Sequence, residues 1–431
     1  MNERQNIKNM IKQSNKKNIL LTRLLLSLGI LIFIRIGTFL PVPGINHGHL
    51  AFYLERHSMT KSLVSTFAGN NTFVIGVFTL NIFPYINASI LMQVLTSLFP
   101  NLSKLQKEGG AEGRRTISKL TRLITLGWAL IQSFSIAFYL KRALFDWNVY
   151  LAIEIMVWLT TGAMIVLWLS EIITEYGLGN GASLLIYTNI VSNLPNLAKN
   201  LFLETDVNIS IISWILIVSI FFIAISGIVL LQEGTRIIPL ISSRQLNQPA
   251  RRSVTTLAEI KNNYIPLRFN QAGVMPIILT SAVLVVPNYI NNLGLLPIVT
   301  LPVFIKSSKI IYWIIYFTLI LLFSSFYSTI VLNPKDISNE LQKMAVSIPG
   351  IRPGVETTFY LKKVMERVTY LGAIMLALLA TLPNLIEAIL PGSNFNGLGT
   401  TSFLILVGVI LDLSREVRSI ILSNIYNDMF N

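Results

Sequence analysis

Cysteine is absent from this sequence, and charged residues are scarce. Without cysteine the chain forms no disulfide, no thiolate nucleophile and no cysteine-ligated zinc site. Charged residues make up only 13% of its 431 residues, whereas a soluble protein carries roughly a quarter. These shortages argue against a disulfide-stabilised protein and against an ordinary soluble one.

Motifs for enzymatic or metal chemistry are also scarce. His47 and His49 form an H-x-H pair with only Glu55 as a nearby acidic group, so we interpret them as solvated loop residues rather than metal ligands. The glycine-rich stretch 177–181 joins two apolar segments instead of a strand and a helix, so it predicts a tight turn and not a phosphate loop. We expect no catalytic residue, no metal and no cofactor.

Apolar residues, in contrast, make up 53% of the chain and recur in long runs from end to end. A helix needs about 20 predominantly apolar residues to cross a bilayer. The predicted fold class is therefore an all-α polytopic membrane protein with ten transmembrane helices. The first run continues without a cleavage site, which indicates a retained span and not a signal peptide. The spans are predicted near residues 20–40, 73–99, 119–140, 150–170, 182–199, 210–231, 271–290, 310–331, 368–389 and 400–420.

Positive charge predicts the orientation of these spans. The net charge is +14, from 34 Lys and Arg against 20 Asp and Glu. In a soluble protein this would suggest nucleic acid, but here the basic residues gather in the N-terminal tail and in alternate loops, and we expect no DNA partner. The positive-inside rule places both termini and the long loops 232–270 and 332–367 on the cytoplasmic or equivalent side.

The predicted spans divide five and five, into an N-terminal half at 1–205 and a C-terminal half at 206–431. Inverted halves are common in membrane proteins that enclose a path. Because no sequence repeat links the halves, their pseudo-symmetry rests on the span count alone.

The segment 62–100 breaks an apolar span in two. A stub of mixed polarity at 62–72 ends in Gly-Asn-Asn, and an apolar stretch follows from Phe73 to Phe99. Unpaired backbone groups cannot face lipid, because each costs several kcal/mol there. The stub is therefore expected inside protein or in a water-filled cavity, and interrupted spans of this kind point to a substrate path.

Isoleucine recurs at helical spacing on two spans, at 82, 86 and 90 and again at 186 and 190. Such a stripe is typical of packing or of a lipid-facing surface, and it also fits a pore that closes by dewetting. Asn81 and Asn87 lie among the first group, with Gln132, Thr280 and Ser281 as candidate partners across a helix seam. Ordinary interhelical hydrogen bonds and a seam that opens both fit these amides.

Eight motifs, in the correct order, resemble the SecY family of protein-translocation channels over nearly the whole chain. They are RIGTFLPVPGI (35–45), FPYINASILMQVL (83–95), KEGGAEGRR (107–115), TEYGLGNGASLLI (174–186), PLRFNQAGVMPII (266–278), NPKDISNELQK (333–343), IPGIRPGVET (348–357) and GTTSFLILVGVILD (399–412).

The resemblance implies a clam-shell of two five-helix halves around an hourglass pore, with residues 62–72 as a plug on the far side. The implied pore ring is Ile82, Ile86, Ile186, Ile190, Ile278 and Ile405. The implied lateral gate includes Asn87, Ile90, Gln132 and Thr280. The implied docking residues in the two long loops are Arg251, Arg252 and Arg352.

The same resemblance implies a passive channel that moves unfolded precursor proteins across a membrane and releases transmembrane segments sideways into lipid. The implied partners are SecE, a SecG-like subunit, the SecA ATPase, the ribosome and precursors with signal sequences. Sequence segments such as QEGTRIIP and MERVTYLGAI resemble those of the cyanobacterial and plastid branch of the family. We therefore expect the plastid thylakoid membrane, with a bacterial plasma membrane as the alternative.

Two other functions stay open on the residues alone. A small-solute secondary transporter would need ionisable groups near mid-membrane, whereas Glu154, Glu171, Glu387 and Asp412 fall at or near span ends. A structural scaffold of a photosynthetic complex would show no contact with precursor proteins. Solute uptake and precursor crosslinking distinguish these classes from a protein channel.

Overall fold

The computed structural model describes most of the chain. The residues it describes are 2–45, 75–141, 148–203, 211–242, 263–271, 273, 276–277, 279–280, 309–331, 333–389 and 400–429. The predicted plug at 62–72, the histidine pair, and Ile278, Ser281, Arg251 and Arg252 lie outside them.

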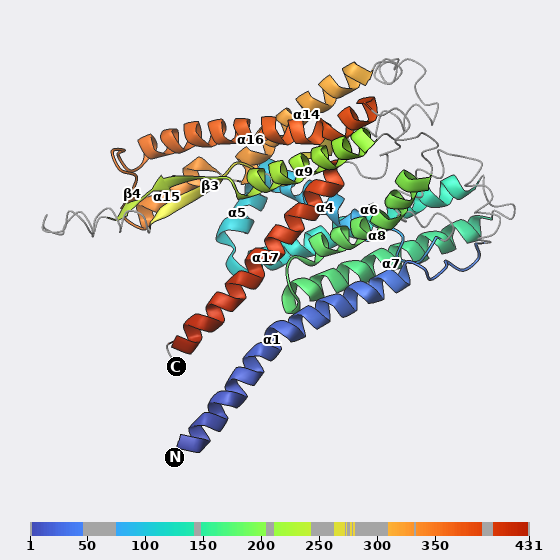
Figure 1. Cartoon of the computed structure of the whole chain (residues 1–431), viewed down its shortest axis with the longest axis horizontal. Coiled ribbons are helices and arrows are strands. Elements are labelled where there is room, and N and C mark those ends of the chain that lie inside the picture. The colour runs from blue at the N-terminus through green and yellow to red at the C-terminus, as the bar shows by residue number, and fades with distance from the viewer. Residues whose placement is uncertain are drawn as a thin grey trace, which may run out of the picture. The chain divides into compact units, whose positions relative to one another are not determined.

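The chain divides into two compact units, one of residues 1–199 with 409–431 and one of residues 200–408. Pseudo-symmetry between the halves 1–205 and 206–431 stays a prediction. The first unit contains α1 (Asn2–Gly37), α4 (Phe83–Leu98), α5 (Pro100–Glu108), α6 (Gly110–Leu140), α7 (Val149–Tyr176), most of α8 (Gly181–Leu203) and most of α17 (Thr400–Met429). The second contains α9 (Ile211–Glu233), β1 (Thr235–Pro239), β2 (Ile241–Ser242), β3 (Tyr264–Arg268), α14 (Lys309–Val331), α15 (Pro334–Lys343), β4 (Val346–Ser347) and α16 (Val355–Ile389) (Figure 1).

Every predicted span except the seventh overlaps one of these helices. The seventh, at 271–290, falls mostly outside the described residues, although 276–277 and 279–280 are helical. Within the described part of the chain, four helices are long and apolar enough to cross a membrane. They contain Leu20–Gly37, Gly110–Phe138, Val149–Tyr176 and Val355–Leu382.

Large apolar side chains cover the outside of these helices. Ile131 and Phe134 on α6 and Trp168 on α7 are each more than half exposed. A helix that carries apolar residues all around is typical of a membrane span, because lipid accepts the outward face. The exposed apolar surface therefore agrees with the predicted membrane location.

The second predicted span is wrong at its start. The apolar stretch from Phe73 predicts a helix of about 27 residues, whereas α4 begins at Phe83 and has 16 residues. The helix begins where Pro84 occupies the first turn, which suits proline because that position has no intrahelical N–H partner. Asn81, two residues before the helix, has a φ of 48° and lies in the left-handed region, so the chain turns there instead of continuing as a helix.

The core of the first unit surrounds α6. Both α4 and α7 pack against this helix, and Ser133 of α6 meets Thr160 of α7 in a buried hydroxyl–hydroxyl hydrogen bond of 3.0 Å. Ile75 and Leu80, which precede α4, are fully buried in the same cluster as Ile155 and Leu159 of α7. The non-helical entry to α4 is therefore part of the core.

The two long loops of the second unit share one small ordered structure. β1 pairs antiparallel with β3, with Ile237 opposite Pro266, and β2 pairs with β4, with Ile241 opposite Ser347. The first pair lies within the loop 232–270, whereas the second joins that loop to the loop 332–367. One apolar cluster supports both pairs, with buried members Ile238, Leu267, Leu341, Ile348, Leu361, Val364, Met365 and Val368. In Figure 1 this structure lies at one end of α16.

Candidate functional site

Residues 75–82 form irregular backbone whose hydrogen bonds are made inside the protein. The Val42 N–H donates to the Ile75 carbonyl at 3.0 Å, and the Val77 N–H donates to the Leu40 carbonyl at 2.9 Å. These bonds pair the segment with the chain that follows α1, with Pro41 opposite Gly76. Each satisfied group avoids a cost of several kcal/mol at membrane depth.

Two glycines allow this segment to approach its neighbours. A β-carbon on Gly76 would overlap the Thr38 carbonyl, and one on Gly162 of α7 would overlap the Val77 carbonyl. Both contacts are to backbone atoms, which cannot rotate away. The segment is thus held between the end of α1 and the middle of α7.

Two of the predicted pore isoleucines lie where this segment meets α4. Ile82 ends the irregular stretch and Ile86 lies one turn into α4, and both are buried. Ile186 and Ile190, on α8 of the same unit, are half-buried. Ile405 is a half-buried residue of α17 that belongs to the other unit. A closed ring therefore stays a prediction, because its members come from both units and Ile278 lies outside the described residues.

The predicted gate residues differ in their environments. Ile90 is buried and Asn87 is half-buried on α4. Within the described part of the chain, the buried Oε1 of Gln132 on α6 has no hydrogen-bond partner. Thr280 is buried, and its hydroxyl donates to the Pro276 carbonyl at 2.8 Å, so its proton is used locally. Buried hydroxyl pairs that do join described helices are Ser133 with Thr160 and Ser328 with Thr369, and the sequence analysis missed both because they depend on how two helices pack.

The predicted docking residue Arg352 lies on a well-anchored turn between β4 and α16. Its side chain is exposed, while its carbonyl accepts a hydrogen bond from the Thr357 hydroxyl at 2.8 Å. The Ser338 hydroxyl of α15 donates to the Gly354 carbonyl at 2.9 Å. Gly350 and Gly354 both have positive φ, at 77° and 112°, as tight turns require. The turn thus presents a cation on a rigid support.

The glycine-rich stretch 177–181 forms the predicted tight turn. Gly179 has a φ of 75°, and a β-carbon on Gly181 would overlap the Ser170 carbonyl of α7. The Gly181 N–H donates to the Thr174 hydroxyl at 2.9 Å. Close packing of α8 against α7 therefore explains these glycines without a bound phosphate.

These features define a class of protein: a helical polytopic membrane protein with irregular backbone buried among its helices. That construction is tolerated where the backbone is enclosed by protein or lines a cavity, as in channels and transporters.

Comparison with known proteins identifies the family. The family model for SecY matches residues 76–414. The protein translocase subunit SecY of Trieres chinensis is 72% identical over 425 residues, which cover 98% of this chain and 100% of that protein. The corresponding protein of Guillardia theta is 44% identical over 96% of this chain and 98% of its own length. That of Synechococcus elongatus is 42% identical over 94% of this chain and 93% of its own length.

Solved structures share the fold. A SecY structure described in connection with its plug domain has a TM-score of 0.63 at 19% identity and covers 92% of each chain. Sec61 in a canine ribosome–channel complex has a TM-score of 0.56 at 17% identity and covers 92% of this chain and 93% of its own.

The chain belongs to the SecY family. This confirms the predicted fold class and the predicted role as the protein-conducting channel subunit of the Sec translocase. The family is one of translocation channels and is not a class of enzymes.

Proposed function

We propose that this channel closes around precursor chains with a ring of isoleucines on the two units. The ring residues are Ile82, Ile86, Ile186, Ile190, Ile278 and Ile405. The observation that carries the proposal is the buried irregular segment 75–82, which packs against α7 at Val77 and leads through Ile82 into the first turn of α4. A ring of branched apolar side chains excludes ions by dewetting and still yields to an extended polypeptide.

Opening involves the plug and a lateral gate. The stub 62–72 closes the far side at rest and moves into water when a signal sequence enters. The gate includes Asn87, Ile90, Gln132 and Thr280. The unpaired amide oxygen of Gln132 supports this assignment, because a seam with unsatisfied polar groups is less costly to open than one with complete hydrogen bonds.

The two long loops dock the SecA motor or a ribosome. Arg352 and, in the neighbouring loop, Arg251 and Arg252 supply the cationic contacts. The exposed Arg352 side chain on an anchored turn supports this role. SecE and a SecG-like subunit complete the channel. Among similar solved structures, Sec61 lies in a canine ribosome–channel complex and a yeast Ssh1 complex is bound to the 80S ribosome, which supports a ribosome as a partner.

The membrane is the thylakoid of a plastid, with both termini on the stromal side. The support is the high identity to translocase subunits of Trieres chinensis and Guillardia theta together with the basic residues of the N-terminal tail and of alternate loops.

Crosslinking of a stalled precursor tests the ring. A photoreactive residue at Ile86 is expected to attach to a precursor arrested in the channel of the assembled translocase. The matched control is Ile131, an α6 isoleucine that is 58% exposed on the outer face. Attachment at Ile131 and not at Ile86 would contradict the assignment of Ile86 to the pore ring.

A further inference from the structure

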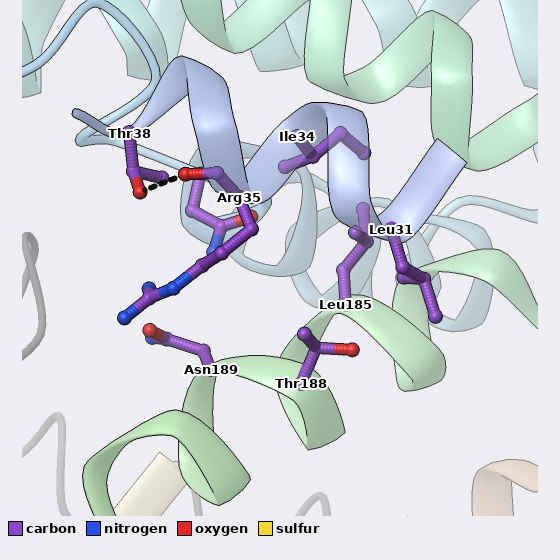
Figure 2. Close-up of a pocket in the computed structure, with 8 residues that line it drawn as sticks. Leu31, Ile34, Arg35, Thr38, Leu185, Thr188 and Asn189 are labelled. Atoms are coloured by element: carbon purple, nitrogen blue, oxygen red, sulfur yellow. Dashed lines mark hydrogen bonds between the residues drawn. The ribbon is translucent and has the colours of Figure 1, made fainter. Parts of the chain in front are cut away.

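A small cavity lies in the first unit where α1, the irregular segment 75–82 and α8 meet. It offers about 10 Å³ to the centre of a water molecule, and a cavity of roughly 10–15 Å³ by this measure holds one water. Figure 2 shows Arg35 extending from α1 towards Asn189 on α8. The lining residues are Leu31, Ile34, Arg35, Thr38, Asn81, Leu185, Thr188 and Asn189.

The cavity contains an unsatisfied acceptor. Asn81 is only 8% exposed, and within the described part of the chain its Oδ1 has no hydrogen-bond partner. Leaving such a group unpaired costs about 1–3 kcal/mol. The backbone of Asn81 is held in place, since it lies in the left-handed region and its N–H donates to the Phe78 carbonyl at 2.9 Å.

The other polar groups of the lining determine what fits. The Thr188 hydroxyl donates to the Leu184 carbonyl at 2.9 Å. The Thr38 hydroxyl donates to the Arg35 carbonyl at 2.7 Å (Figure 2). Each hydroxyl has therefore used its proton and offers only lone pairs. The Arg35 guanidinium, which lies over the Phe39 ring at 5.4 Å, offers only N–H donors. The Asn189 amide, which faces the guanidinium in Figure 2, offers both N–H donors and an acceptor oxygen.

Water matches this arrangement better than any ion does. An anion would face the acceptor oxygens of Asn81 and Thr188, and a cation would face the Arg35 guanidinium. A water molecule donates two hydrogen bonds and accepts others, so it satisfies both kinds of group at once.

We propose that a single ordered water occupies this cavity. It donates to the Asn81 Oδ1 and the Thr188 hydroxyl oxygen and accepts from the Arg35 guanidinium. In this way it joins α1, the irregular segment and α8.

The water is also a positioning element for the pore ring, a consequence that rests on the proposed function. Asn81 directly precedes Ile82, and Thr188 lies between Ile186 and Ile190 on α8. The water thus connects the backbone that carries one pair of isoleucines with the helix that carries the other. Its loss is expected to loosen the alignment of the two pairs.

The first test is a map of the complete translocase at a resolution that shows ordered water. Crystals grown in chloride and in bromide are compared for anomalous signal at the cavity. The proposal expects one peak within hydrogen-bond distance of the Asn81 Oδ1, without bromide signal. An empty cavity, or a bromide peak, overturns it.

The second test is the isosteric change Thr188→Val, which removes one acceptor and keeps the volume. The matched control is Thr161→Val on α7, where the hydroxyl also donates to a carbonyl four residues earlier but is exposed. We expect Thr188→Val to weaken the water peak and to raise ion conductance of the resting channel several-fold, with no change in the control.

The water peak tests the proposed water site, and the ion conductance tests its positioning role in the pore ring. A Thr188→Val channel that keeps its water peak overturns the assignment of that hydroxyl as an acceptor. A channel that loses the water without leaking overturns the positioning role and leaves the site intact. Failure of the crosslinking at Ile86 would count against the pore ring and leave the water peak untouched.

Discussion

The Val77 carbonyl oxygen lies against Gly162 of α7, in the space that any other side chain would fill. Val77 belongs to the irregular segment before α4, and Gly162 is buried in the middle of a 28-residue helix. The contact is between backbone atoms on both sides. It fixes how closely the irregular segment approaches α7.

Replacement of this glycine is expected to destabilise the first unit. Gly162→Ala places a methyl group on the Val77 carbonyl, and overpacking of this kind costs about 1–3 kcal/mol. The matched control is Gly127→Ala on α6, where an added β-carbon meets nothing within 4 Å. Alanine there gains about 0.5–1 kcal/mol of helix preference. Thermal inactivation of the purified complex should show a lower midpoint for Gly162→Ala alone; equal midpoints would contradict the contact.

The buried hydrogen bond between Ser133 and Thr160 is expected to contribute little. Such bonds between membrane helices average about 0.6 kcal/mol, because the separated helices also find partners. A double-mutant cycle with Ser133→Ala and Thr160→Val, followed by denaturant titration in bicelles, measures the coupling. Ser135 and Thr161 serve as the control pair, since both are exposed and bond only within their own helices. A coupling free energy above about 2 kcal/mol would contradict this and show that the bond strongly stabilises the packing of α6 against α7.

A polar substitution in the pore ring is expected to leak ions. Ile186→Ser on α8 places a hydroxyl where the proposed seal excludes water, which favours wetting of the constriction. Ion conductance of the resting channel in planar bilayers should rise, while translocation of a precursor continues. Ile131→Ser on the outer face of α6 should leave conductance unchanged. If both variants conduct alike, Ile186 does not line the seal.

Charge reversal at the docking turn is expected to impair motor-driven transport. Arg352→Glu changes an exposed side chain, and the bond from the Thr357 hydroxyl goes to the Arg352 backbone, so the turn should persist. We expect SecA-dependent translocation to fall at least tenfold while the complex still assembles. Arg115→Glu, an exposed change near the start of α6, is the control. Loss of assembly in the Arg352 variant would instead indicate a structural role.

Sequence patterns predicted the helices well and the irregular segment poorly. The apolar stretch from Phe73 gave no sign that α4 begins at Phe83, because hydropathy is the same for helical and extended backbone. Pro84 and Asn81 carried local signals, since proline favours a first helical turn and asparagine tolerates positive φ. The sequence alone did not reveal that Leu40 and Val42 form backbone hydrogen bonds with this segment, at Val77 and Ile75.

In the candidate site, too, features set by local sequence were predicted, and features set by the packing of distant residues were not. The turn at 177–181 was predicted correctly because its glycines signal local geometry. The hydroxyl pair Ser133 and Thr160 was missed because it depends on how two helices pack. The polar cavity lined by Asn81 was also missed, because its other lining residues Arg35 and Thr188 are far apart along the chain.

The irregular segment has a consequence for how the channel is made. Its partners are the stretch after α1, which is synthesised before it, and Gly162 of α7, which is synthesised only after α4, α5 and α6. A chain inserted from its N-terminus therefore carries residues 75–82 into the bilayer while one side of their final enclosure does not yet exist. The enclosure of residues 75–82 is therefore complete only after α7 has been synthesised and has packed against Val77.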